Sequence, residues 1–134
     1  MIMIKKLHPD AVMPKFMTEG AAGMDITAIA VKETHQYIEY KTGLAISIPK
    51  GYAGLLFQRS SVSNMDLMLS NAVGVIDPDF TGEITFRFRK LGDNIYKVGD
   101  RIGQLVVVPF FSEVKEVDNL EETKRGDGGY GSTN

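Results

Sequence analysis

Asp77 is the side chain in this sequence best placed to act as a base. It lies between Gly74 and Gly82 in a segment that we interpret as a hairpin, and it precedes the rigid Pro78. An aspartate is ionised at neutral pH, so one that is held against a water molecule acts as a general base. The alternative is an ordinary turn former before proline, which requires no function.

An arginine followed by hydroxyl residues, Arg59-Ser60-Ser61, has the chemistry of a phosphate cradle. Backbone N–H groups at a helix N-terminus and a planar guanidinium both favour an anion. The alternative is a serine N-cap beside a surface arginine.

Two further clusters carry polar side chains at the start of apolar strands. Asp25 follows a run of small residues, for which a turn is the alternative, and Arg101 with Gln104 opens a strand, for which solvation of a strand edge is the alternative. The glycine-rich tail, residues 124–134, contains Arg125 and Tyr130. Glycine lets the backbone take positive φ and approach a ligand, so the tail suits a segment that orders on binding; a frayed terminus is the alternative.

Short β-type segments must position these clusters. Residues 84, 86 and 88 are apolar and alternate with polar neighbours, which predicts a strand with one face in the core. Residues 60–68 are the one predicted helix. Many short strands separated by turns indicate a sandwich, barrel or jelly roll, and the predicted strands are residues 1–7, 24–31, 36–48, 52–58, 83–90 and 104–111.

Composition limits the remaining possibilities. A chain of 134 residues fits a single domain, and its net charge of -2 does not favour a protein that coats nucleic acid. The sequence has no cysteine, which excludes disulfides and cysteine-ligated zinc, and no apolar run approaches the length of a membrane span. The amino-terminal residues lack a signal-peptide layout, so we expect a cytoplasmic protein.

The clusters together occur in the order and spacing of the five motifs of trimeric dUTPases, and the chain resembles that family from about Ala21 to Thr133. The resemblance implies an all-β fold, a dUTPase-like jelly roll or distorted β-barrel that forms a homotrimer, with at most one short helix. The matching motifs are residues 22–25, 59–61, 74–82, 101–105 and 125–133.

The resemblance also implies an activity: the hydrolysis of dUTP to dUMP and pyrophosphate, with Mg²⁺ held mainly by the triphosphate. Asp77 would orient and deprotonate the water that attacks the α-phosphorus. Asp25 would act near the metal through water, or would pair with an arginine. The residues that hold the triphosphate would be Arg59, Ser60, Arg125, Ser132 and Thr133, together with Gln104, which is expected to be catalytic like Asp77. Ser61 and Gly131 would also bind the substrate.

In the family the backbone of the third motif reads uracil, here around Asn71, Gly74, Val75 and Ile76. Tyr130 would stack on the base, and Phe80 would lie under the deoxyribose to exclude a 2′-hydroxyl. Three positions depart from the family pattern. Phe80 replaces a frequent tyrosine, Gln58 a frequent proline and Ser61 a frequent glycine, which puts the geometry of the second motif in question.

Two alternatives remain at this point. A dCTP deaminase shares a related trimeric fold, but as aligned it carries a catalytic glutamate where this chain has Arg87, and it lacks the glycine-rich tail. A regulatory protein that keeps the nucleotide pocket but acts through a protein partner is the other alternative. Turnover of dUTP and dCTP separates the three.

Overall fold

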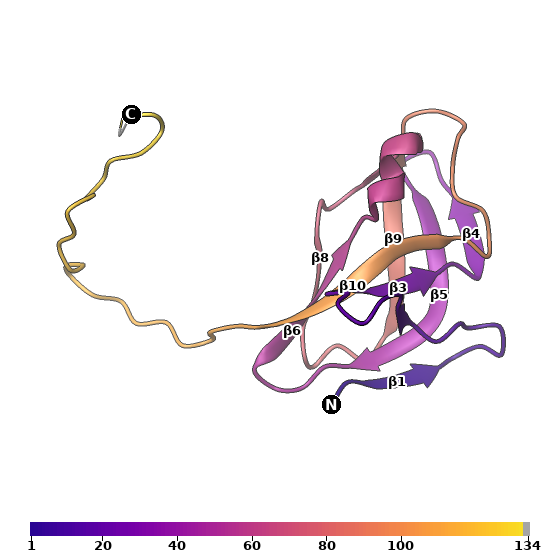
Figure 1. The fold of residues 1–134 in the computed structure, drawn as a ribbon, viewed down its shortest axis with the longest axis horizontal. Coiled ribbons are helices and arrows are strands. Elements are labelled where there is room, and N and C mark those ends of the chain that lie inside the picture. The colour runs from indigo at the N-terminus through magenta and orange to yellow at the C-terminus, as the bar shows by residue number, and fades with distance from the viewer. Residues whose placement is uncertain (133–134) are drawn as a thin grey trace.

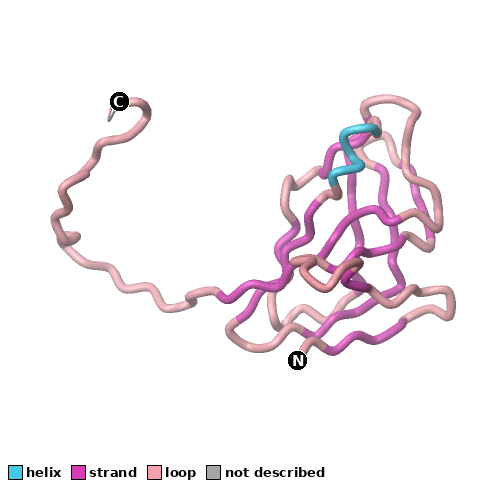
Figure 2. The backbone as a smooth tube through the Cα atoms, viewed as in Figure 1, coloured by secondary structure: helices cyan, strands magenta, loops and turns pink. Residues whose placement is uncertain are grey.

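The structure is a computed structural model that describes residues 1–132. It contains ten β-strands and one short 3₁₀ helix, η1 (Figures 1 and 2). No helix in that part of the chain is long and apolar enough to cross a membrane. The strands are β1 (Met3–Lys6), β2 (Lys15–Phe16), β3 (Met24–Thr27), β4 (Ala30–Glu33), β5 (Ile38–Ser47), β6 (Tyr52–Phe57), β7 (Leu67–Leu69), β8 (Gly74–Ile76), β9 (Glu83–Lys90) and β10 (Arg101–Pro109), and η1 is Ser60–Asn64.

Two antiparallel sheets pack face to face as a jelly roll, which confirms the predicted all-β fold. One sheet, called sheet A here, has the order β1-β5-β9-β7, with β4 also paired to β5. The other, sheet B, has the order β2-β3-β10-β6-β8. The long strand β5 pairs with β4 through its first half and with β1 through its second half.

The core lies between the two sheets and is rich in aromatic rings. Ile84, Phe86 and Phe88 of β9 are at most 1% exposed, so the predicted alternation on this strand is confirmed. The Tyr40 and Phe88 rings meet edge to face with centroids 5.7 Å apart. Burial of such large side chains supplies much of the free energy that holds the sheets together.

Three local expectations were wrong. The helix predicted over residues 60–68 is a 3₁₀ helix that ends at Asn64, because the following residues pair with β9 as β7. The strand predicted over residues 24–31 is divided between the two sheets as β3 and β4. The segment around Asp77 is not a hairpin, because β8 pairs with β6 in sheet B whereas β9 belongs to sheet A. Its turn therefore crosses from one sheet to the other.

After Pro109 the described chain forms no further strand and extends away from the sheets (Figure 1). Phe111 is fully exposed, and Val114 and Leu120 are nearly so. The predicted phosphate- and base-binding residues of the tail are therefore carried on an extension that leaves the folded body.

Candidate functional site

Asp25 lies at the centre of a cluster of charged side chains. Its Oδ2 accepts a hydrogen bond from Arg101 Nη1 at 3.1 Å and lies 3.3 Å from Arg59 Nε. One carboxylate cannot neutralise two guanidinium groups, so the cluster keeps a net positive charge and attracts an anion. Of the two roles proposed for Asp25, pairing with arginine is the arrangement present in the structure.

A β-bulge in β10 brings the two polar side chains of the fourth motif to this cluster. The register between β10 and β3 shifts between Arg101 and Gly103, which places Arg101 opposite Thr27 and Gln104 opposite Asp25. Thr27 and Asp25 are two residues apart and share a face of the sheet, so Arg101 and Gln104 also share one. In a regular strand, residues three apart would point to opposite faces.

The segment expected to bind phosphate, residues 59–61 and here called the phosphate loop, is held by one hydrogen bond within the second motif and by others from outside it. Arg59 Nη1 donates to Ser61 Oγ at 3.3 Å and to the Arg101 carbonyl at 3.4 Å, and Ser61 Oγ lies 2.9 Å from Tyr96 Oη. Ser60 is exposed beside them. The 3₁₀ helix η1 is short and has a small dipole, so the guanidinium is the group of this loop best suited to attract an anion.

Gln104 connects the fourth motif to the first and second. Its Nε2 donates to the carbonyl of Gln58 at 3.2 Å. Its Oε1 lies against Gly23, where a Cβ atom would come within 2.6 Å. Gly23 therefore makes room for the Gln104 side chain, and a larger residue there would displace it.

The segment expected to read the base, residues 71–76 and here called the base-recognition turn, begins with a strained backbone and continues into β8. Ala72 has a φ of 60°, a value that residues with a side chain rarely adopt, and Val73 N donates to the Asn71 carbonyl at 2.6 Å. Val75 is 62% exposed, while Gly74 packs against Leu56. The predicted uracil-reading backbone is thus presented at the surface beside β6.

Asp77 follows β8 and lies in an open groove of about 520 Å³. Phe80 N donates to the Asp77 carbonyl at 3.1 Å, so the turn places both residues close together. The Phe80 ring is partly exposed and packs over Gly82, where a Cβ atom would come within 2.7 Å of the ring. The groove is lined by Ile48, Lys50, Asp77, Pro78 and Asp79.

Within one chain, Asp77 and the phosphate loop line separate grooves. The Arg59 guanidinium is held by Asp25 on β3, and β10 and β6 lie between β3 and β8. Three strand spacings of ~4.8 Å give about 14 Å across the sheet. The two sites are also offset along the strands, because Gln104, which faces Asp25, pairs with Phe57, whereas Ile76 pairs with Gly54.

The tail makes short-range hydrogen bonds. Arg125 Nε donates to the Gly128 carbonyl at 2.8 Å, and Gly129 N donates to Ser132 Oγ at 2.9 Å. Gly131 has a φ of 90°, as the glycine content of this segment led us to expect. Tyr130 is fully exposed. Thr133 lies outside the described residues.

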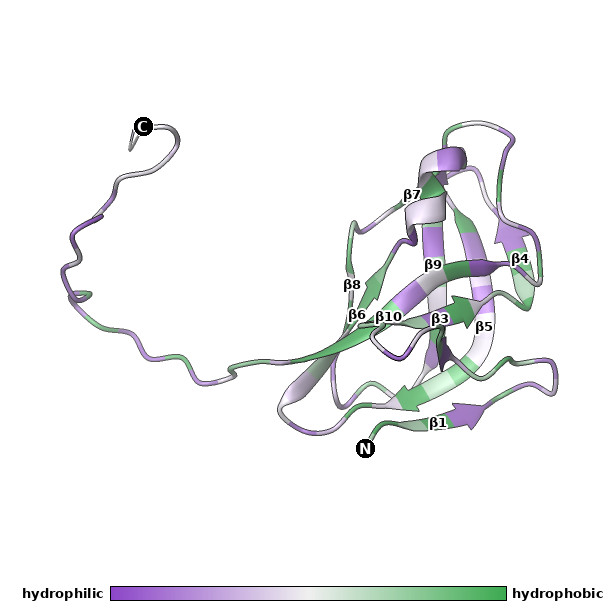
Figure 3. Cartoon of the chain, viewed as in Figure 1, coloured by the Kyte–Doolittle hydropathy of each residue, from purple (hydrophilic) through white to green (hydrophobic). Residues whose placement is uncertain are grey.

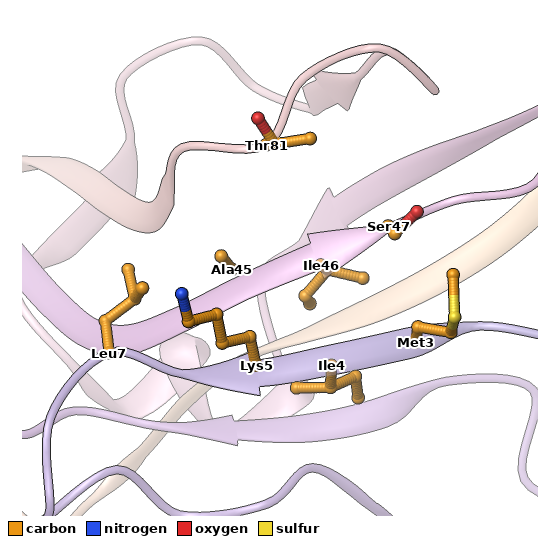
Figure 4. A pocket seen from close by; sticks show the side chains of 8 residues that line it. All are labelled: Met3, Ile4, Lys5, Leu7, Ala45, Ile46, Ser47 and Thr81. Carbon is orange, nitrogen blue, oxygen red and sulfur yellow. The ribbon is translucent and has the colours of Figure 1, made fainter.

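A separate groove of about 410 Å³ lies between β1, β5 and the Thr81 turn (Figure 4). Lys5 is the one charged side chain that lines it, and Thr81, to which no role is assigned, is its one residue from the motifs. It is therefore not the candidate site.

Sequence reasoning missed three residues of the candidate site. Arg101 was quoted in its motif but given no role, although it pairs with Asp25. Tyr96 and Lys50 lie outside every motif and reach the site through the fold. The one sequence signal for these three residues was the positive charge of Arg101, because the first motif contains an aspartate, Asp25, that could pair with it.

The comparisons with known proteins agree on one family. A family model described as dUTPase matches residues 10–134. The deoxyuridine 5'-triphosphate nucleotidohydrolase of Escherichia phage T5 is 40% identical, over 99% of this chain and 98% of the relative. The protein of the same name from Helicobacter pylori strain J99 is 39% identical, over 98% of this chain and 95% of the relative.

Solved structures give the same result. A variant of the dUTPase of Staphylococcus bacteriophage 80alpha, solved with dUpNHpp, is similar with a TM-score of 0.82 and 29% identity, over 99% of this chain and 98% of that one. A mutant of the dUTPase of phage phi11 of S. aureus has a TM-score of 0.75 at 28% identity, over 91% of this chain and 99% of that one. The latter structure is described as revealing the coordination of a structural Mg(II) ion.

Proposed function

Because this chain belongs to the dUTPase family and hydrolyses dUTP to dUMP and pyrophosphate, we propose that its active sites are shared between the subunits of a homotrimer. The observation that carries this proposal is the separation of the base from the phosphate loop. Asp77 and Arg59 line different grooves of one chain, and the tail carries Arg125 and Tyr130 away from both. Neighbouring chains can bring the three parts together.

The outer face of sheet B supports an assembly with other copies. Val75, Leu55 and Val106 lie side by side across β8, β6 and β10, because each pairs directly with the next. Val75 is 62% exposed in the single chain, and Figure 3 shows the hydrophobic character of β8 and of the later part of β10. Burial of this apolar row against neighbouring copies would stabilise a trimer.

The chemistry assigned to the site is an attack of water on the α-phosphorus. Asp77 would accept a proton from the water and direct the water oxygen at the α-phosphorus, in line with the leaving pyrophosphate. Arg59, fixed by Asp25 and Ser61, would offset negative charge on the phosphates from a position set before the substrate binds. Gln104 and Ser60 would add hydrogen bonds, and the tail residues Arg125, Gly131, Ser132 and Thr133 would close over the phosphates.

Mg²⁺ suits this site as an ion carried by the substrate. Within residues 1–132 no group of three or more acidic or histidine side chains could hold a metal, and the Asp25 carboxylate is already shared by two arginines. A triphosphate with water ligands satisfies the preference of Mg²⁺ for oxygen donors. When bound, the ion would withdraw charge from the phosphate oxygens, and Asp25 would act near it through water.

Base and sugar selection are assigned to the surface around Asp77. The backbone of the base-recognition turn, with Asn71, Gly74, Val75 and Ile76, would pair with uracil, and Tyr130 would stack on it, an interaction worth ~1–3 kcal/mol per base. Phe80 would pack under the deoxyribose and leave no space for a 2′-hydroxyl. A cytoplasmic location for the enzyme stays a prediction.

Arg87 gives a structural reason to set aside deamination. Its Nε donates to Glu39 Oε2 at 2.7 Å, and this hydrogen bond raises the pKa of the guanidinium above its usual value. Arg87 also lies 4.4 Å from the centre of the Tyr37 ring. A permanently charged, paired guanidinium cannot shuttle a proton.

Refolding two inactive variants together tests the shared site. One is Asp77→Asn, and the other is truncated after Thr123. A site works when its base comes from a truncated chain and its tail from an Asp77→Asn chain, which holds for about a quarter of sites in randomly mixed trimers. We expect dUTP hydrolysis to return on mixing. Failure to recover activity in mixed trimers, verified by native mass spectrometry, would overturn the shared site.

A further inference from the structure

Gln58 makes contacts in several parts of the proposed site, although it binds no substrate in the assignment above. Its carbonyl accepts the hydrogen bond from Gln104 Nε2, and its side-chain Oε1 accepts a hydrogen bond from Leu69 N at 2.9 Å. The next residue is Arg59, whose guanidinium is the group of the phosphate loop best suited to attract an anion. Gln58 is only partly buried, yet both ends of the residue are fixed.

The Leu69 amide is an edge group of sheet A. β7 is the last strand in the order β1-β5-β9-β7, and Ser70 N donates toward β9, to the Arg87 carbonyl at 2.9 Å. Successive amides of a strand point to opposite sides, so Leu69 N points to the unpaired edge. There the side chain of Gln58 replaces the missing neighbour strand.

The same leucine begins the turn that leads to the uracil-reading backbone. Leu69 is 4% exposed, and its carbonyl accepts a hydrogen bond from Ala72 N at 3.1 Å. Ala72 is the residue with the strained φ of 60°. Such a conformation persists only where the surroundings hold it, and Gln58 holds the residue on which this turn is built.

We propose that Gln58 is a positioning residue that fixes the base-recognition turn, residues 71–76, relative to the phosphate loop of the same chain. The inference rests on the proposed shared site, in which these two segments serve different active sites. Gln58 therefore links neighbouring sites of the trimer. If Gln58 only capped the strand edge, its loss would destabilise the fold but would not weaken base binding more than phosphate binding.

Gln58→Met tests the link, because methionine is similar in length but lacks the amide oxygen. Leu69 N then loses its partner, and we expect the KM for dUTP to rise about tenfold while kcat changes less than about twofold. Inhibition by dUMP, which carries the base, should weaken by a similar factor, whereas inhibition by pyrophosphate should not change. An unchanged KM, or equal weakening of dUMP and pyrophosphate, would overturn the proposal.

A double variant, Gln58→Met with Asp77→Asn, locates the affected site. In trimers that also contain wild-type chains, a site works only if its Asp77 comes from a wild-type chain, and its base-recognition turn then comes from that same chain. Its phosphate loop can come from either kind of chain. We expect a single KM equal to that of the wild type, whereas a second, raised KM would show that Gln58 acts on its own loop instead. If Gln58→Met does not fold, Gln58→Asn withdraws the same acceptor. Activity of Asp77→Asn itself would count against the proposed function and not against this link.

Discussion

The phosphate loop and the tail both carry an arginine and hydroxyl groups, but the fold holds them in opposite ways. Arg59 is fixed by Asp25, Ser61 and the Arg101 carbonyl, which lie far apart in the sequence. The described hydrogen bond of Arg125 is to Gly128. The loop is therefore organised before substrate arrives, whereas in the proposed site the tail loses conformational entropy at the moment of binding. Of the two arginines proposed to bind phosphate, Arg59 is positioned by folding and Arg125 only by the ligand.

The substitution Asp77→Asn removes the chemistry and leaves both regions intact. We expect kcat to fall by ~10²–10⁴, the usual loss for a general base, while the affinity for a non-hydrolysable dUTP analogue stays within about threefold. Stopped-flow pyrophosphate release and calorimetric binding measure the two quantities. Near-normal turnover would remove Asp77 from the mechanism.

Truncation after Thr123 isolates the contribution of the tail. We expect kcat/KM for dUTP to fall about 100-fold, because a charge-assisted phosphate contact and a stacked aromatic ring are both lost. The free energy of unfolding should not change, since the tail extends away from the sheets. Urea unfolding of the full-length and truncated proteins provides the comparison. A large loss of stability would mean that the tail is part of the folded body.

Phe80→Ala tests the selection of deoxyribose over ribose. Removing the ring opens the space assigned to exclusion of a 2′-hydroxyl, so we expect the ratio of kcat/KM for dUTP to that for UTP to fall about tenfold. Phe80 is partly exposed, and its loss should have little effect on folding. The matched control is Phe80→Tyr, which keeps the ring and should keep the ratio. No change in the ratio for the alanine variant would assign sugar selection elsewhere.

Tyr40→Phe should affect stability without affecting chemistry, the reverse of the truncation. Tyr40 is buried and its hydroxyl donates to the Tyr96 carbonyl at 2.8 Å, so we expect a loss of ~1–2 kcal/mol at neutral pH. Burial, aided by the Asp100 carboxylate, raises the pKa of Tyr40 from 10.0 to about 12. This group therefore stabilises the fold fully below pH 10, and its contribution is lost as the pH rises toward 12.

The direction of this pH dependence can be checked by urea unfolding at about pH 8 and about pH 11. The wild type should lose more unfolding free energy between the two values than Tyr40→Phe does. Equal losses would show that Tyr40 does not contribute to alkaline unfolding.

The sequence was most informative where structure is local. The alternation of Ile84, Phe86 and Phe88 predicted a strand and its buried face because neighbouring side chains determine that pattern. The short strands β7 and β8 are set by pairing with β9 and β6, which are not their nearest neighbours in the sequence, so their residues carry little periodic signal. The helix expected at residues 60–68 was wrong for the same reason, because pairing of β7 with β9 outweighs a weak helical tendency.

The site was predictable as a set of motifs but not as a geometry. The motifs that contain Asp25, Arg59 and Gln104 do meet at one place on sheet B. The contact between Ser61 and Tyr96 joins residues that no motif connects. The register shift in β10 could not be foreseen, because a bulge depends on how two strands align and not on the composition of either.

The bulge in β10 also determines where the chain can change its length during evolution. Loss of one residue between Arg101 and Gln104 would remove the bulge, whereas gain of one residue with the bulge retained would turn one of the two side chains toward the core. Gly103 already lies there against Phe86, where a Cβ atom would come within 2.3 Å. The preceding turn at Gly99 is open, with nothing within 4 Å of an added Cβ. We therefore expect insertions and deletions among descendants of this sequence to gather before Arg101, while residues 101–104 are inherited at a constant length.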